Sequence, residues 1–244
     1  INIQFAIKGN EIYVLEVNPR ASRTVPFVSK ATGLSVAKIA SRVMAGEKLS
    51  KFNLKKKNKN TFAVKEAVFP FNKFPEVDVL LGPEMKSTGE AMGFDNNFGL
   101  SFAKSQIASN NSIPLKGNAF ISVKDKDKDK ILNNAKKLIK FGFSLFATSG
   151  TARYLITNGV KCKKINKVNQ GSPHIVERLN KKNISLVINT TEGKDSISDS
   201  FSLRRTSLVN KIPYFTTIAA ANACLESIEA LKKYPIKVRA LQDS

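Results

Sequence analysis

Strand-like and helix-like patterns alternate through the second half of the chain, and this alternation limits the possible folds more than any other property of the sequence. Short apolar runs typical of buried strands are separated by longer segments whose apolar residues recur at helical spacing. The expected strands are residues 119–123, 143–147, 162–165, 184–188 and 212–215; the expected helices are residues 131–139, 151–157, 201–209 and 217–231, and another with Ser172 as its N-cap and Pro173 at its first position. This alternation predicts an α/β fold, a five-stranded parallel sheet with helices on both faces.

The first part of the chain has a different pattern. The expected elements are two hairpin strands over residues 1–7 and 11–18, joined by a turn at Lys8-Gly9-Asn10, and helices over residues 35–45 and 98–108. The pattern changes near Asn110-Asn111-Ser112. We place the domain boundary there, which gives one domain over residues 1–110 and a second over residues 111–244.

The charge balance raises the question of a nucleic-acid partner. The chain carries a formal net charge of +21, and basic proteins of this kind can bind polyanions. However, the lysines lie in solvated runs, and between Lys124 and Lys130 they alternate with aspartates that cancel much of their field. The sequence has no set of interleaved aromatic and basic residues suited to stacking bases. We therefore expect no nucleic-acid partner.

Cysteine, histidine and apolar content exclude several other classes. Cys162 and Cys224 are too few for a disulfide framework, which favours a reduced, cytoplasmic compartment. His174 is the single histidine, so we expect neither a histidine-based metal site nor a Ser-His-Asp triad. No apolar run approaches the roughly 18 residues that span a bilayer, and we expect no membrane association. The sequence starts without Met, directly in a strand pattern at Ile1, which suggests a fragment.

A first set of polar residues lies on the predicted hairpin. Glu16 and Asn18 share one face of their strand, and the turn places Gln4 nearly opposite them. Hard cations such as Mg²⁺ prefer oxygen ligands of these types. Arg20 and Arg23 follow closely enough to hold phosphate charge. The spacing alone favours a simpler alternative, a hairpin with ordinary polar side chains in solvent.

A second set of polar residues follows the strands of the predicted sheet. Its segments are Lys124, Lys128, Thr148-Ser149-Gly150-Thr151, Lys167, Asn189-Thr190-Thr191 and residues 214–217. Ligands bind beyond the carboxyl ends of strands in an open parallel sheet, and a hydroxyl-bearing loop at a helix N-terminus offers free amides to an anion. The Thr148–Thr151 segment by itself is equally well explained as a helix N-cap. The convergence of all segments on one edge favours a phosphate site.

The hairpin residues belong to longer segments that resemble a known family. These segments are Gln4, Glu16-Val17-Asn18-Pro19-Arg20 with Arg23, the run 24–33, and the run 64–90, which contains Phe71-Asn72-Lys73-Phe74-Pro75 and Leu81-Gly82-Pro83-Glu84. They resemble the second ATP-grasp (α+β) half of carbamoyl phosphate synthetase large subunits. The resemblance implies an ATP-dependent carbon–nitrogen ligase with ATP as substrate. In it, Gln4, Glu16 and Asn18 would hold two Mg²⁺ or Mn²⁺ ions, and Arg20 and Arg23 would be catalytic contacts to phosphate. The adenine-binding elements are outside this sequence, so we expect the chain alone to be inactive.

The residues of the second half resemble the Rossmann-like, methylglyoxal-synthase-like domain, which is the allosteric domain of the same family. The matching segments include residues 122–126, 147–152, 166–168, 171–175 and 189–191, with Arg204-Arg205. The resemblance implies that a nucleoside monophosphate effector, uridylate or inosinate, binds in this half. The implied site residues are Ser122, Lys128, Thr148, Thr151, Lys167, Asn189 and Thr191.

The family resemblance also implies further ligands and partners. Ornithine would contact Glu66, Tyr214 and Thr216, although Phe69 and Phe215 depart from the pattern expected there. The implied partners are a glutamine amidotransferase small subunit and further copies of the chain, which would associate through their allosteric domains. The implied roles are in arginine and pyrimidine biosynthesis.

Two alternatives share the second domain but not the first. A free-standing lyase of the methylglyoxal synthase type would carry an aspartate in the glycine-rich loop, and Gly171-Ser172-Pro173-His174 has none. We therefore interpret His174 as a capping or packing residue. A relative of the purine cyclohydrolases would have a similar Thr-Ser-Gly-Thr loop. Neither alternative explains residues 1–110.

Overall fold

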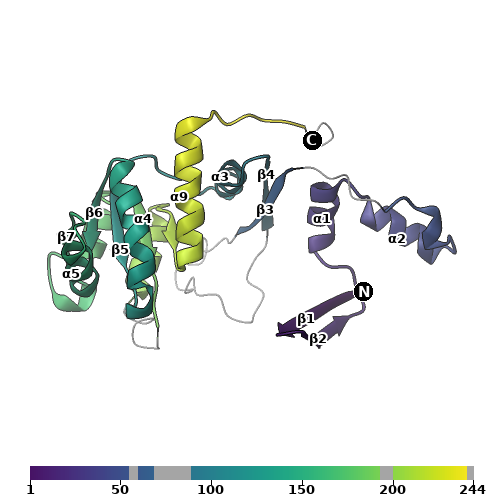
Figure 1. The fold of residues 1–244 in the computed structure, drawn as a ribbon, viewed down its shortest axis with the longest axis horizontal. Coiled ribbons are helices and arrows are strands. Elements are labelled where there is room, and N and C mark those ends of the chain that lie inside the picture. Colours follow the sequence, from purple (N-terminus) through teal and green to yellow (C-terminus); the bar gives the residue numbers. More distant parts are fainter. Residues whose placement is uncertain (55–59, 69–88, 193–199, 241–244) are drawn as a thin grey trace. The chain divides into compact units, whose positions relative to one another are not determined.

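The computed structural model describes residues 1–54, 60–68, 89–192 and 200–240. The chain divides into two compact units, residues 1–60 with the residues from Val238 onward, and Thr61–Lys237. Each unit is described by itself, with element labels as in Figure 1. Within the described ranges, none of the helices has the length and apolar character needed to cross a membrane.

The first unit begins with the predicted hairpin. Strands β1 (Asn2–Lys8) and β2 (Glu11–Asn18) pair antiparallel, and Gln4 lies directly opposite Glu16. Gly9 has φ of 61° in the turn, a left-handed conformation that glycine adopts without steric cost. Helices α1 (Thr24–Thr32) and α2 (Val36–Met44) and the 3₁₀ turn η1 (Leu49–Lys51) follow. The sequence analysis did not anticipate α1.

The second unit begins with an antiparallel strand pair and a helix, β3 (Phe62–Val68), β4 (Gly89–Asp95) and α3 (Phe98–Ala108). Ser101 Oγ lies 2.9 Å from the carbonyl oxygens of both Phe62 and Gly93, so it ties α3 to both strands. The rings of Phe102 on α3 and Phe215 have centroids 6.3 Å apart, so these elements pack with the sheet that follows in the same unit. Their assignment to an ATP-grasp domain that ends near residue 110 remains a prediction. The sequence segments within residues 69–88 that carry part of the family resemblance lie outside the described residues.

The rest of the unit is the predicted α/β fold. Its five strands, all parallel, lie in the order β7-β6-β5-β8-β9. The strands are β5 (Gly117–Ser122), β6 (Phe143–Ala147), β7 (Lys163–Lys164), β8 (Leu186–Asn189) and β9 (Tyr214–Phe215). The helices are α4 (Lys128–Lys140), α5 (Ser149–Thr157), α6 (Ile175–Asn180), α8 (Phe201–Val209) and α9 (Ile218–Lys233), with 3₁₀ turns η3 (Asp125–Asp127) and η4 (Val168–Gln170).

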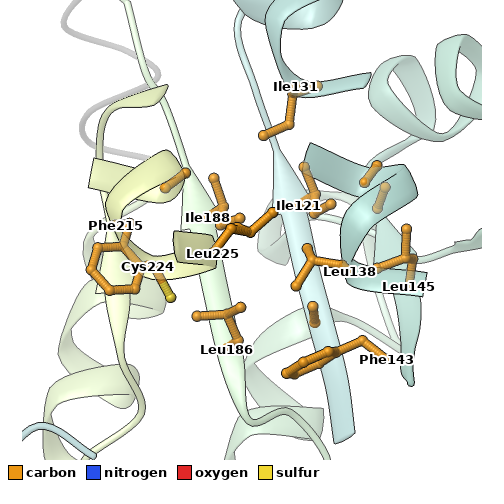
Figure 2. Close-up of a cluster of buried hydrophobic side chains, with 14 of the residues drawn as sticks. Ile121, Ile131, Leu138, Phe143, Leu145, Leu186, Ile188, Phe215, Cys224 and Leu225 are labelled. Atoms are coloured by element: carbon orange, nitrogen blue, oxygen red, sulfur yellow. The ribbon is translucent and has the colours of Figure 1, made fainter. Parts of the chain in front are cut away.

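Successive side chains of the strands enter two hydrophobic clusters, one on each face of the sheet. On β5, Ile121 joins the cluster covered by α4, α5 and α9, which also holds Leu138, Leu186 and Cys224 (Figure 2). Its neighbour Phe120 joins the other cluster, which α6 and α8 cover. The fold thus has three layers, and the loops at the carboxyl edge of the sheet are held on a rigid frame.

Two details of the predicted elements were wrong. Helix α6 begins at Ile175 with His174 as its N-cap, whereas Ser172 and Pro173 form a cis peptide in the preceding turn. Ser-Pro is a signal for turns as well as for helix starts, which explains the error. Helix α5 begins at Ser149 rather than Thr151, so Thr148 is its N-cap.

Candidate anion site at the carboxyl edge of the sheet

A cavity of about 660 Å³ opens at the carboxyl edge of the five-stranded sheet. It is lined by the loops that follow β5, β6 and β8, by residues between β7 and α6, and by the start of α8. All seven residues proposed for the effector site line it: Ser122, Lys128, Thr148, Thr151, Lys167, Asn189 and Thr191. The structure therefore brings these seven side chains together, whereas residues 214–217, which the sequence analysis also placed at this edge, are not part of the described lining.

Hydroxyl groups join the loops of this cavity to one another. Ser122 Oγ and Thr148 Oγ1 are 3.0 Å apart, which links the loop after β5 to the start of α5. Thr151 Oγ1 accepts a hydrogen bond from the Val123 backbone amide at 3.2 Å. Thr151 is only 2% exposed, so this bond is shielded from water. The cavity wall is thus held in position before any ligand arrives.

The start of α5 presents its backbone to this cavity. Ser149, Gly150 and Thr151 line the cavity, and the Thr148 side chain does not cap the helix. The first amides of a helix have no partner within it and lie at the positive end of the helix dipole. A Cβ added to Gly150 would lie 3.6 Å from Lys128 Nζ, so this ammonium lies beside the same amides. The arrangement suits a phosphate group.

Carboxylates accompany the lysines of the cavity. Lys128 Nζ lies 2.7 Å from Asp125 Oδ1, and Lys126 Nζ lies 2.9 Å from Glu192 Oε1. The hydrogen bond from Lys128, and then its charge, lower the pKa of the Asp125 carboxyl. The hydrogen bond and charge of Lys126 lower the pKa of Glu192 in the same way. The sequence analysis did not propose these carboxylates as site residues, although Glu192 directly follows the Asn-Thr-Thr segment.

A buried amide closes one side of the cavity. Asn189 is 3% exposed, and its Nδ2 donates to Ser200 Oγ at 3.1 Å and to Tyr214 Oη at 2.7 Å. Tyr214 was proposed to contact ornithine, and its hydroxyl instead accepts this hydrogen bond from Asn189, a residue proposed for the effector site.

The other residues proposed to bind ornithine are Glu66 and Thr216, and neither shares a hydrogen-bond partner with Tyr214 in the contacts described here. Glu66 accepts a hydrogen bond from Gln106 Nε2 at 2.8 Å, and partial burial raises the pKa of its carboxyl. Thr216 is exposed after β9, and Phe215 is buried. Phe69 lies outside the described residues. These contacts do not join Glu66 to Tyr214 or Thr216, so the ornithine site remains a prediction.

The metal-type residues of the hairpin converge on one oxygen. Glu16 Oε1 accepts hydrogen bonds from Gln4 Nε2 at 2.7 Å and from Asn18 Nδ2 at 2.8 Å. Rotation of the two amides would turn their oxygens to the same point. One carboxylate with neighbouring amide oxygens fits Mg²⁺ or Mn²⁺ held together with phosphate oxygens.

The two arginines proposed to contact phosphate are exposed. Arg20 Nη1 donates to the Ala21 carbonyl at 3.4 Å, and Arg23 is the N-cap of α1. These contacts do not bring either guanidinium to Glu16. Across the described residues, no group of three or more His, Cys, Asp or Glu side chains is arranged to hold a metal. The catalytic roles of Arg20 and Arg23 remain predictions.

His174 lies next to the cavity in sequence but does not line it. Its Nε2 lies 3.3 Å from Glu177 Oε1, and within the described part of the chain its buried Nδ1 has no hydrogen-bond partner. The geometry agrees with the interpretation of His174 as a packing residue at the start of α6.

Comparison with known proteins matches two separate parts of the chain to two families. Residues 1–52 match the family described as "Carbamoyl-phosphate synthase L chain, ATP binding domain", and residues 130–216 match the "MGS-like domain". The chain is 52% identical over 249 residues to the carbamoyl phosphate synthase large chain of Mesorhizobium japonicum, with all of this chain and 21% of the relative covered. The chain belongs to the carbamoyl phosphate synthase large-chain family.

Other members of the carbamoyl phosphate synthase large-chain family are similarly close. The large chain of Pseudomonas putida is 53% identical over 245 residues, covering 100% of this chain and 23% of that protein. The "large chain, C-terminal section" of Aquifex aeolicus is 49% identical over 250 residues, covering 96% of this chain and 47% of that protein. The chain thus spans between about a fifth and a half of the length of these relatives. A solved methylglyoxal synthase from Elizabethkingia anophelis is a distant likeness, with a TM-score of 0.39, 21% identity, and coverage of 46% of this chain and 79% of that one.

Proposed function

We propose that the MGS-like part of the chain binds a nucleoside monophosphate and regulates a carbamoyl phosphate synthase. The observation that supports the proposal is the convergence of seven polar residues, from four separate loops, on one cavity of about 660 Å³. Its polar part offers helix amides, hydroxyls and lysines to a phosphate. Its apolar part, with Phe120, Ile175 and Leu203, is suited to a nucleoside.

We further propose that the hairpin contributes to ATP-dependent phosphorylation of carbamate. Gln4, Glu16 and Asn18 would hold Mg²⁺ or Mn²⁺, which neutralises phosphate charge when bound. Glu16 supplies the negative charge, and the neighbouring amides orient its carboxylate. Arg20 and Arg23 would bind the transferring phosphate. The isolated chain is expected to make no carbamoyl phosphate, because positioning supplies most of the rate in phosphoryl transfer.

The remaining expectations belong to the same proposal. They are glutamine-dependent activity with an amidotransferase small subunit, association of copies through the MGS-like domains, control by ornithine, a cytoplasmic location, and roles in arginine and pyrimidine synthesis. The family supports each of them, and the low cysteine content also favours the cytoplasmic location.

Calorimetric titration of uridylate and inosinate into the 244-residue chain tests the regulatory proposal. Lys167→Ala removes a cavity lysine, and we expect it to weaken nucleotide binding by about 10- to 100-fold, in line with the loss of a charge-assisted hydrogen bond. Lys140→Ala is the matched control. It removes the same charge at the far end of α4, roughly 18 Å along the helix from Lys128.

A diffuse attraction between a basic protein and an anion gives a different result. Both variants would then lose affinity slightly and equally, and affinity would follow the salt concentration. Equal effects of the two substitutions, or no uptake of either nucleotide by the parent chain, would contradict the regulatory proposal.

A further inference from the structure

The described lining of the cavity carries charges of both signs, with positive charge in excess. Four lysines line it, Lys124, Lys126, Lys128 and Lys167, together with the carboxylates Asp125 and Glu192. Four positive charges less two negative charges leave a net formal charge of +2 among these residues. A phosphomonoester carries roughly −1.5 to −2 at pH 7. The cavity is therefore matched to a single phosphate group.

The two carboxylates pair with different lysines, and both are exposed, Asp125 by 93% and Glu192 by 52%. Asp125 pairs with Lys128, whose side chain is 23% exposed and whose ammonium lies beside Gly150 at the start of α5. A phosphate bound at these amides must share Lys128 with Asp125 or displace it. Asp125 is thus an internal competitor for the anion.

Glu192 pairs with a second lysine of the lining. Its ion pair with Lys126 joins the loop after β8 to the turn after β5, and the two side chains are 52% and 75% exposed. Lys126 and Glu192 therefore form part of the solvent-exposed rim of the cavity. A second or third phosphate extending outward from the start of α5 would approach this rim. There it would meet a carboxylate, and Lys126 would already be paired. Repulsion between like charges disfavours such a ligand, and the repulsion grows with the charge of the ligand.

We propose that Asp125 and Glu192 are specificity-determining residues that restrict the cavity to ligands with one phosphate group. The inference rests on the proposed function, since it concerns the same site. It adds a reason why di- and triphosphates are rejected. It also assigns a role to two ion pairs that neither the fold nor the phosphate contacts require.

Glu192→Gln in the 244-residue chain tests the inference. Uridine mono-, di- and triphosphate are titrated by calorimetry in metal-free buffer at constant ionic strength. We expect the affinity for the triphosphate to rise about 3- to 10-fold more than the affinity for the monophosphate, because the gain scales with ligand charge. The diphosphate should show an intermediate change.

The control is Glu229→Gln on α9. Glu229 pairs with Lys233 at 2.6 Å and is 42% exposed, so the substitution removes an equivalent ion pair outside the cavity and changes the net charge equally. We expect it to leave the ratio of triphosphate to monophosphate affinity unchanged. Equal changes in the two variants would show a general charge effect and overturn the inference.

Asp125→Asn is a second, independent variant. It frees Lys128, and we expect the affinity for the monophosphate to rise about 2- to 5-fold. If the parent binds uridylate but neither cavity variant changes affinity or selectivity, the inference fails and the proposed function stands. If the parent binds none of the uridine phosphates, the proposed function fails and the inference with it.

Discussion

Residues 1–60 and Thr61–Lys237 are both rich in alternating apolar residues, but only the second unit buries them. No described side chain of residues 1–60 is buried, and apolar residues on both faces of the hairpin are exposed, Leu15 by 64%. In Thr61–Lys237, strand side chains fill two clusters beneath helices, and Leu186 is fully buried. A two-stranded hairpin has no second layer against which to pack, and it is marginally stable in water for that reason.

The same difference separates the two candidate sites. In the sheet unit, buried hydroxyls such as that of Thr151 hold the cavity loops in place. On the hairpin, the amides of Gln4 and Asn18 orient Glu16 through solvent-exposed hydrogen bonds. A site held by buried groups is organised before ligand binding, whereas an exposed one depends on other surfaces to fix it. We therefore expect nucleotide binding, but not phosphoryl transfer, from this chain by itself.

Truncation of one leucine in each unit should give the largest contrast. Leu186→Ala removes a fully buried side chain of β8 and should lower the free energy of unfolding by about 2–5 kcal/mol. Leu15→Ala on β2 removes an exposed side chain and should change it by less than about 0.5 kcal/mol. Urea unfolding followed by circular dichroism measures both. Similar losses in the two variants would mean that the hairpin also buries its apolar face.

The sheet could be predicted from the sequence because its signals are local. Five apolar runs and the helical spacing between them identified every strand of the parallel sheet. Helix α1 was missed because Thr24–Thr32 contains several β-branched residues and Pro26, which have low helix propensity. The packing of β3, β4 and α3 with the sheet unit depends on contacts between segments far apart in the chain. The local pattern that placed the domain boundary near residue 110 contains no information about such contacts.

Part of the cavity lining was also predictable from the sequence. The hydroxyls and lysines that follow each strand were identified because strand ends of a parallel sheet share an edge. The roles of Asp125 and Glu192 were not identified. The alternation of Lys and Asp between Lys124 and Lys130 indicated only that the electrostatic field of the lysines is weakened. It did not indicate which carboxylate pairs with which lysine, because that depends on how the loops approach one another.

A glycine substitution in each of the two units should repeat the contrast in stability, with a smaller loss than the leucine truncation. A Cβ on Gly99 of α3 would lie 2.4 Å from the carbonyl oxygen of Glu226 on α9. Gly99→Ala should therefore lower the free energy of unfolding by about 1–3 kcal/mol through overpacking, although alanine is the better helix former. Circular dichroism in urea measures the change.

The control is Gly9→Ala in the hairpin turn. Gly9 has φ of 61° and no atom within 4 Å of an added Cβ, so the cost is local backbone strain of roughly 1–2 kcal/mol. It should leave the unfolding of Thr61–Lys237 unchanged. If Gly99→Ala is stabilising instead, α3 does not pack on α9, and the segment before residue 110 is independent of the sheet unit.

The smallest expected effect concerns the partly buried carboxylate of Glu66, which accepts a hydrogen bond from the Gln106 amide. Partial burial raises the pKa of Glu66 above its ordinary value of 4.5, although the hydrogen bond from Gln106 acts in the opposite direction. Between the ordinary and the raised pKa, the folded state binds more protons than the unfolded state, so stability falls as pH rises through this range. Glu66→Gln should remove this decline and make the chain more stable at pH 7, by less than about 1 kcal/mol because solvent screens the carboxylate. Urea unfolding of the variant and the parent between pH 4 and pH 7 measures the change, and a steeper decline with pH in Glu66→Gln would show that the carboxylate of Glu66 stabilises the fold.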